Sequence, residues 1–181
     1  MKNAILIHGT SGTPKHFWFP YIKENLAQKG YEVWAPQVPN SDRPELSISL
    51  PFFLQGGNYS GQTVLIAHSS GCPTALSILE RIDVRIAKAI LVAGFYQAID
   101  DDGLSDLILQ QEYDWERIQN NVRETYLINS DNDPWGCNDA QARPVALALG
   151  ACLIVPVGQG HMGSESYAQP YKEFPLLTRL F

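Results

Sequence analysis

The stretch "LIAHSSGCP", residues 65–73, places two serines between an apolar run and a segment of helical character. Ala67 and Gly71, two positions before and after Ser69, are small enough to allow a very sharp strand-to-helix turn at that serine. Such a turn, a nucleophile elbow, exposes one hydroxyl at the end of the strand, against the helix N-terminus. The pattern predicts Ser69 as a nucleophile and the backbone N–H of Ser70 as an oxyanion donor. A serine that only caps the helix is the alternative.

A serine hydroxyl is a weak nucleophile and needs a base within hydrogen-bond reach. The chain has four histidines. His161 stands in "GQGHMG", just after the last apolar run, so its loop can reach over Ser69, and we predict it as the base. His68 occupies the variable elbow position, and its side chain is expected to point elsewhere. His8 is expected to shape its loop, and His16 to lie on the surface of the first helix.

An imidazole base also needs a carboxylate that holds its tautomer and stabilises its charged form. The loop "NSDNDPWG" offers Asp131 and Asp133, with Asp139 further on. Any of these could instead be a turn or cap residue. We favour Asp133, which precedes a proline at the head of a turn, and keep Asp131 as the alternative. The order Ser69, Asp133, His161 is one of the chain orders in which such triads occur.

A second oxyanion donor is expected in "HGTSG", where the first apolar run ends. The backbone N–H of Thr10 is the predicted donor, and the flanking glycines let the backbone approach a substrate. A phosphate-binding loop is the rival interpretation, but "GTSGTPK" lacks the required G-K-[ST] ending. Trp18, Phe19 and Trp135 are candidates to line an acyl pocket, with core packing as the favoured role for Trp18 and Phe19.

Short apolar runs alternate with segments of helical character, which predicts a doubly wound α/β domain. The runs lack polar alternation, as expected of parallel strands covered on both faces. They span residues 4–7, 31–36, 63–67, 87–95, 125–130 and 152–157. Ligands bind at the carboxyl ends of such strands, where all four polar loops lie. The first helix is expected to begin at Thr13-Pro14 and end at Gly30, and one short helix is expected within 41–62.

Length and composition narrow the function classes. A chain of 181 residues favours one domain over residues 1–181. The net charge is −6 without any cluster of Lys and Arg, so nucleic acid is not an expected partner. No apolar run approaches the length of a membrane span, and "MKNAILIHG" does not read as a signal peptide. The three cysteines form no zinc pattern and fit a reduced, cytoplasmic setting.

The segment 96–122 is strongly acidic. A solvated face is the simpler interpretation, and an acidic rim beside the site is the alternative. A metal site at Asp100, Asp101 and Asp102 is disfavoured, because no histidine or glycine turn is spaced to complete it.

Four motifs together, "ILIHGTSG", "LIAHSSGCP", "INSDNDP" and "GQGHM", give a sequence that resembles the small serine hydrolases of the α/β-hydrolase superfamily. Within that superfamily it is similar to the group of YdeN-type bacterial proteins and retinoblastoma-binding protein nine. The resemblance implies a three-layer α/β-hydrolase fold with about six mainly parallel strands and no large cap domain. Two departures are visible: Ala67 replaces the usual first glycine of the elbow, and Pro-Trp-Gly-Cys follows Asp133 in place of acid-x-x-Val-Pro.

The resemblance also implies an activity. It assigns Ser69 as nucleophile, Asp133 as acid and His161 as base of a hydrolase that needs no metal or cofactor. A carboxylesterase acting on small acyl esters is the expected enzyme, with a thioesterase or an aminoacyl amide hydrolase or peptidase as alternatives. A non-catalytic interaction module on the same fold is the alternative of another class. The oligomeric state is left open.

Overall fold

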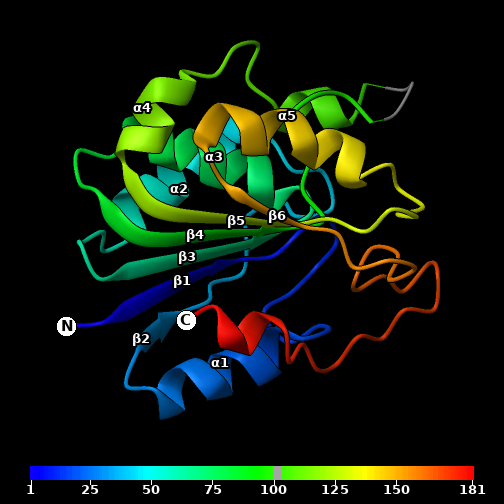
Figure 1. Cartoon of the computed structure of the whole chain (residues 1–181), viewed down its shortest axis with the longest axis horizontal. Helices are drawn as coiled ribbons and strands as arrows, with labels where there is room; N and C mark the ends of the chain where they lie inside the picture. Colours follow the sequence, from blue (N-terminus) through cyan, green and yellow to red (C-terminus); the bar gives the residue numbers. More distant parts are fainter. Residues whose placement is uncertain (100–102) are drawn as a thin grey trace.

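The computed structural model describes residues 1–99 and 103–181, and its centre is a six-stranded sheet (Figure 1). The strands are β1 (Asn3–Ile7), β2 (Glu32–Trp34), β3 (Thr63–His68), β4 (Ile86–Val92), β5 (Val122–Ile128) and β6 (Cys152–Ile154). Their order is β2-β1-β3-β4-β5-β6, and each neighbouring pair is parallel. Each predicted apolar run therefore overlaps a strand, although β2 and β6 are shorter than expected and β5 begins three residues earlier, at Val122.

Helices cover both faces of the sheet. They are α1 (Phe19–Gln28), α2 (Leu46–Gly56), α3 (Gly71–Arg81), α4 (Trp115–Asn120) and α5 (Asp139–Leu149), with short 3₁₀ helices η1 (Ser105–Ile108) and η2 (Leu177–Arg179). Figure 1 shows α1 and the C-terminal η2 on one face and α2 to α5 on the other. The strand order reverses at β1, so right-handed crossovers send α1 to one face and the later helices to the other. The expected three-layer α/β-hydrolase architecture is confirmed.

Alternate residues of each central strand enter two separate cores. In β1, Ala4 and Leu6 pack with α1, whereas Ile5 and Ile7 pack with α2 and α3. All five residues of β1 are buried. Burial on both faces is the physical reason that the strands show no polar alternation.

The predicted start of the first helix is wrong. Helix α1 begins at Phe19, whereas residues 13–18 form turns. The Thr13 hydroxyl accepts the N–H of Lys15 at 3.2 Å, and Phe17 has a left-handed backbone with φ +52°. The left-handed backbone at Phe17 stops a helix from propagating through this segment, although the Thr13 contact is of the kind that caps a helix. The expected helix end at Gly30 holds, since this residue has φ +81°.

The segment between β4 and β5 supplies η1 and α4 but no large cap among its described residues. Four of its acidic side chains are exposed: Asp106, Glu112, Asp114 and Glu116. They therefore form a solvated surface. The three aspartates at 100–102, considered above for a metal site, lie outside the described residues.

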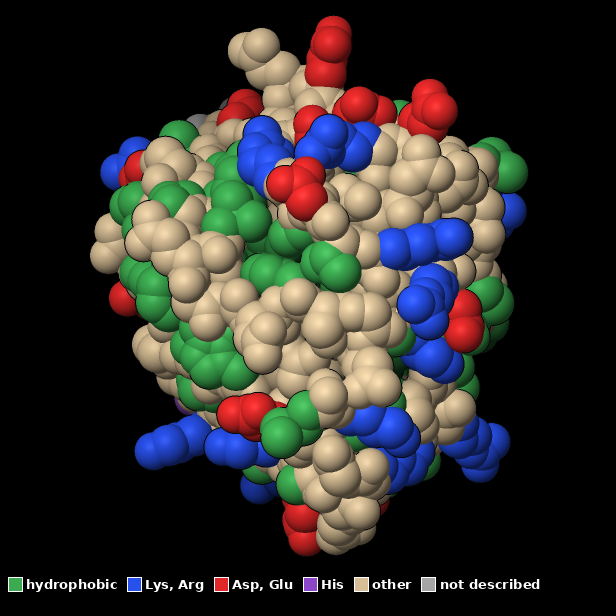
Figure 2. All heavy atoms as spheres, turned by 90° about the vertical axis from the view of Figure 1, so that its left-hand side faces the viewer, with side chains coloured by type: hydrophobic (Ala, Val, Ile, Leu, Met, Phe, Trp, Pro, Cys, Tyr) green, Lys and Arg blue, Asp and Glu red, His purple; other side chains and the backbone are tan. Residues whose placement is uncertain are grey.

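Figure 2 shows the molecule from the left-hand side of Figure 1. Basic and acidic side chains are interspersed on this face. Some of the basic groups of the chain are neutralised by carboxylates, as in the ion pairs of Lys88 with Glu124 at 3.1 Å and Arg117 with Asp83 at 3.1 Å.

Within the residues described, no helix is both long enough and apolar enough to cross a bilayer.

Candidate active site

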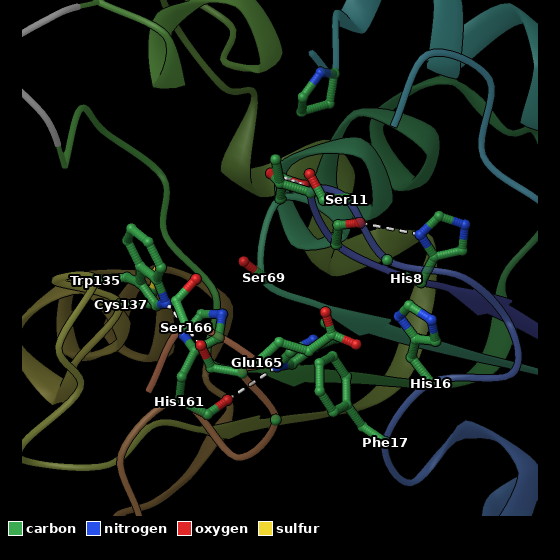
Figure 3. Close-up of a pocket in the computed structure, with 18 of the residues that line it drawn as sticks. His8, Ser11, His16, Phe17, Ser69, Trp135, Cys137, His161, Glu165 and Ser166 are labelled. Carbon is green, nitrogen blue, oxygen red and sulfur yellow. Dashed lines mark hydrogen bonds between the residues drawn. The ribbon is translucent and has the colours of Figure 1, made fainter. Parts of the chain in front are cut away.

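The turn between β3 and α3 has the geometry of a nucleophile elbow. Ser69 has a left-handed backbone, φ +53°, and its N–H donates to the Val92 carbonyl at 3.0 Å. At Gly71 an added Cβ would come within 2.7 Å of the Ile7 carbonyl oxygen, so α3 can pack on β1 only with glycine there. Figure 3 shows Ser69 facing the pocket described below.

The loop after β1 passes directly beside Ser69. A Cβ at Gly9 would come within 2.6 Å of the Ser69 Cβ, which explains the glycine. The Thr10 hydroxyl donates to the Ser70 hydroxyl at 3.0 Å and ties this loop to the elbow. Within residues 1–99 and 103–181, the backbone N–H groups of Thr10 and Ser70 donate to no protein acceptor. These two groups can therefore stabilise an oxyanion that forms beside Ser69.

The predicted acid and base lie in direct contact. His161 Nδ1 is 2.7 Å from Asp133 Oδ2, and the Asp133 side chain is fully buried. The other carboxylate oxygen, Oδ1, accepts the N–H of Trp135 at 2.8 Å, which fixes the carboxylate orientation. An ionised carboxylate only accepts hydrogen bonds, so His161 donates from Nδ1 and keeps a lone pair at Nε2. His161 lines the same pocket as Ser69, and that lone pair suits it to accept a proton there.

The loop that carries His161 is anchored by three polar side chains whose anchoring role was not predicted from the sequence. Ser130 Oγ, Asp131 Oδ1 and Asn132 Oδ1 accept the N–H groups of residues 159, 158 and 160 at 3.0, 2.7 and 2.8 Å. Three successive backbone donors before His161 are thus held by three successive side chains after β5. Asp131, the alternative acid, has this anchoring role. The only sequence signal is the polar run "SDN" itself.

The buried side chain of His68 contacts His161, the predicted base. Its Nε2 donates to the His161 carbonyl at 2.9 Å, and the two rings are 4.8 Å apart. Burial, and then the proximity of His161, lower the pKa of His68 to about 3, so the ring is neutral. Trp18 donates from Nε1 to the Met162 carbonyl at 2.9 Å. His68 is also among the residues that line the pocket, and its contact with His161 was not anticipated.

His8 shapes its loop in the manner expected. Its Nε2 accepts the N–H of Val38 at 2.9 Å, so Nδ1 carries the proton and donates to the Gly9 carbonyl at 3.0 Å. Burial lowers the pKa of His8 and keeps the ring neutral in this bridging role.

Comparison with known proteins agrees with this geometry. A family model described as serine hydrolase matches residues 4–179. The chain belongs to the serine hydrolase family. It is 30% identical over 154 residues to the "Putative hydrolase YdeN" of Bacillus subtilis (strain 168), covering 82% of this chain and 81% of that protein. It is 26% identical over 171 residues to serine hydrolase RBBP9 of Rattus norvegicus, covering 91% and 89%.

Solved structures share the fold. The crystal structure of the ydeN gene product of B. subtilis matches with a TM-score of 0.90 and 24% identity, covering 99% of this chain and 96% of that one. Est1E of Butyrivibrio proteoclasticus with bound ferulic acid matches with a TM-score of 0.66 and 12% identity, covering 100% and 90%.

In this serine hydrolase, Ser69 and His161 open on a pocket of about 590 Å³, a size typical of small-molecule sites. One wall is apolar and largely aromatic. Its residues include Phe17, Phe19, Phe95, Ile99, Ile108 and Trp135. Trp135 lies in this wall, as the sequence suggested. Trp18 does not line the pocket; it packs in the core, with its ring stacked on Phe19 at 4.3 Å.

Polar side chains line the same pocket, and one of them, His16, lies beside Phe17 of the aromatic wall with ring centroids 5.7 Å apart. His16, Arg43 and Glu165 are among the residues that line it. The interpretation of His16 as a surface residue on a helix is therefore wrong, and the cause is the late start of α1. Among the described residues of the segment 96–122, none of the exposed acids Asp106, Glu112, Asp114 and Glu116 lines the pocket, whereas Ile99, Leu104, Ser105 and Ile108 do.

Proposed function

We propose that this serine hydrolase is a carboxylesterase that cleaves small acyl esters through Ser69, His161 and Asp133. The observation that carries the proposal is the buried 2.7 Å contact between Asp133 and His161, in the pocket that Ser69 also lines. A carboxylate in this position fixes the tautomer and stabilises the imidazolium ion that forms when the base takes a proton.

The first half of the reaction forms an acyl-enzyme. Nε2 of His161 accepts the proton of the Ser69 hydroxyl while Oγ attacks the ester carbonyl carbon. The negative charge that develops on the carbonyl oxygen is stabilised by the N–H groups of Thr10 and Ser70. The proton on Nε2 then passes to the leaving alkoxide, and the alcohol departs.

The second half repeats these steps with water. His161 accepts a proton from water, the resulting hydroxide adds to the acyl carbon, and the same two N–H groups bind the oxyanion. The proton on Nε2 returns to Ser69 Oγ as the carboxylic acid leaves. Each step uses groups of this chain and water.

The aromatic wall supports a compact apolar or aromatic acyl group as the substrate feature. Phe17, Phe95 and Trp135 offer flat apolar surfaces beside the elbow, and such groups dominate small-molecule sites. Est1E, which shares the fold, is known with ferulic acid, an aromatic carboxylic acid, bound to it. The substrate class we propose is therefore a small-molecule ester with an aromatic or short apolar acyl part.

The experiment compares Ser69→Ala with the unmodified enzyme on nitrophenyl esters of acetic, butyric and benzoic acids. Loss of the nucleophile is expected to lower kcat by at least about 10³-fold, since triad members act as a unit. Ser47→Ala, an exposed serine in α2, is the matched control and is expected to keep full activity. Undiminished turnover by Ser69→Ala would overturn the proposal. Parallel thioester and aminoacyl amide substrates separate the esterase from the thioesterase and peptidase alternatives.

A further inference from the structure

A third side chain lies against the acid and base of the site. The Cys137 thiol, a carboxylate oxygen of Asp133 and a ring nitrogen of His161 all lie within 4.8 Å of one another, and all three residues are buried. Cys137 and His161 also line the pocket, which gives this cluster a path to solvent (Figure 3). The spacing 133, 137, 161 follows no zinc motif, so only the fold brings these residues together.

These three groups are the ligand types that Zn²⁺ prefers. Ligand atoms in a tetrahedral zinc site lie about 3.3–3.7 Å apart, given metal–ligand distances of about 2.0–2.3 Å. The contact between Asp133 and His161, 2.7 Å, would have to widen, and the remaining separations would have to close by about 1.5 Å at most. Small side-chain rotations supply movements of this size.

The charges also suit a divalent cation. Cysteine binds metals as the thiolate, so binding of the cation releases the thiol proton to solvent and leaves one thiolate and one carboxylate around two positive charges. The assembled site is neutral, which is the condition for burying a charged group at low cost. The thiolate favours zinc over magnesium or calcium.

We propose that a thiophilic divalent cation, with Zn²⁺ as the representative ion, binds Asp133, Cys137 and His161 and inhibits the enzyme. The site is inhibitory because it uses the base itself. A metal ion at Nδ1 moves the single proton of the neutral ring to Nε2, which can then no longer accept a proton from Ser69. A metal ion at Nε2 occupies the accepting lone pair directly. The inhibition rests on the proposed function, whereas the metal site does not.

The binding test uses Co²⁺ as a spectroscopic probe on the full chain. The unmodified enzyme is expected to develop a thiolate-to-cobalt charge-transfer band, and Cys137→Ser to lack it. Cys152→Ser is the matched control, because Cys152 is exposed at the start of β6 and is expected to leave the band unchanged. Thermal unfolding verifies that Cys137→Ser folds. A band that persists in Cys137→Ser, or no band in the unmodified enzyme, would overturn the site.

The functional test measures ester hydrolysis against buffered zinc concentrations. The unmodified enzyme and Cys152→Ser are expected to share one half-inhibiting concentration, and a chelator is expected to restore activity. Cys137→Ser is expected to need at least about tenfold more zinc, since loss of even an outer-shell partner costs 10–100-fold in affinity. Equal zinc sensitivity in Cys137→Ser, or activation by zinc, would overturn the inhibition. If no ester is turned over, the cobalt band still decides the site, so the two proposals fail separately.

Discussion

The ring of His68 donates a hydrogen bond from Nε2 to the backbone carbonyl of His161 at 2.9 Å. Trp18 makes the equivalent contact with the carbonyl of the next residue, Met162. Two buried ring N–H groups therefore hold the loop that carries the base against the apolar core below the site. His68 is a positioning residue in this arrangement, because it acts on the reaction only through His161.

Replacement of His68 tests this positioning role. His68→Phe removes the donor and leaves the His161 carbonyl unpaired, which costs about 1–3 kcal/mol. We expect kcat to fall about tenfold or more with little change in KM, since about 1.4 kcal/mol corresponds to a factor of ten. His68→Gln, whose amide can donate in place of Nε2, is expected to recover most of that loss. If the role of His68 were purely structural, both variants would have a lower melting temperature. His68→Phe would then not lower kcat selectively, and His68→Gln would not restore it.

The stability of the protein is expected to fall in acid because His68 is buried in its neutral form. Its pKa is lowered from 6.5 to about 3 in the folded state. Between these values the unfolded chain binds a proton that the folded chain does not, so stability rises with pH. The slope is up to about 1.4 kcal/mol per pH unit from this residue. Thermal unfolding from pH 7 to pH 4 is expected to show a steeper decline for the unmodified protein than for His68→Gln. Parallel curves would contradict the prediction.

The identity of the triad acid can be decided with two isosteric substitutions. Asp133→Asn removes the charge beside His161 and favours the wrong tautomer, so kcat is expected to fall by about 10²–10⁴-fold. Asp131→Asn keeps an oxygen that can accept the Gly158 N–H, and its kcat is expected to stay within about threefold of the unmodified value. Steady-state kinetics on one nitrophenyl ester measure both. A greater loss from Asp131→Asn would reverse the assignment.

The aromatic wall is expected to set acyl preference. Trp135 lies in this wall, is 45% exposed, and packs edge-on against Tyr167 with ring centroids 5.1 Å apart. Trp135→Ala is expected to raise KM for benzoyl esters by about tenfold, consistent with the loss of 1–3 kcal/mol of apolar contact. Acetyl esters, whose methyl group offers little apolar surface for the Trp135 indole to contact, are expected to change little. An unchanged ratio of kcat/KM for the two esters would remove Trp135 from the acyl site.

The parts of the site that follow from local chain geometry could be predicted from the sequence. The elbow at Ser69 depends on small residues at Ala67 and Gly71, which are visible as a short pattern. The contact between Asp133 and His161 follows from topology, since β5 and β6 are parallel neighbours and their carboxyl ends deliver both loops to one edge.

Features that depend on tertiary contacts could not be predicted. The start of α1 is displaced by the left-handed backbone at Phe17, and this moves His16 from a helix surface into the pocket. His68 contacts His161, which is far from it in the chain. Cys137 likewise lies near His161 only because of the fold. No short sequence pattern predicts either arrangement. The single domain over 1–181, the cytoplasmic setting and the absence of nucleic-acid partners stay predictions.

The most direct measurement of the central claim is covalent labelling with a fluorophosphonate, which reacts with an activated serine, followed by mass mapping of the adduct. We predict one phosphonyl group per chain on Ser69, and greatly reduced labelling of Asp133→Asn. We also predict no labelling of Ser69→Ala. An adduct on another residue, or no reaction of the unmodified protein, would contradict the triad and favour an interaction module on the same fold.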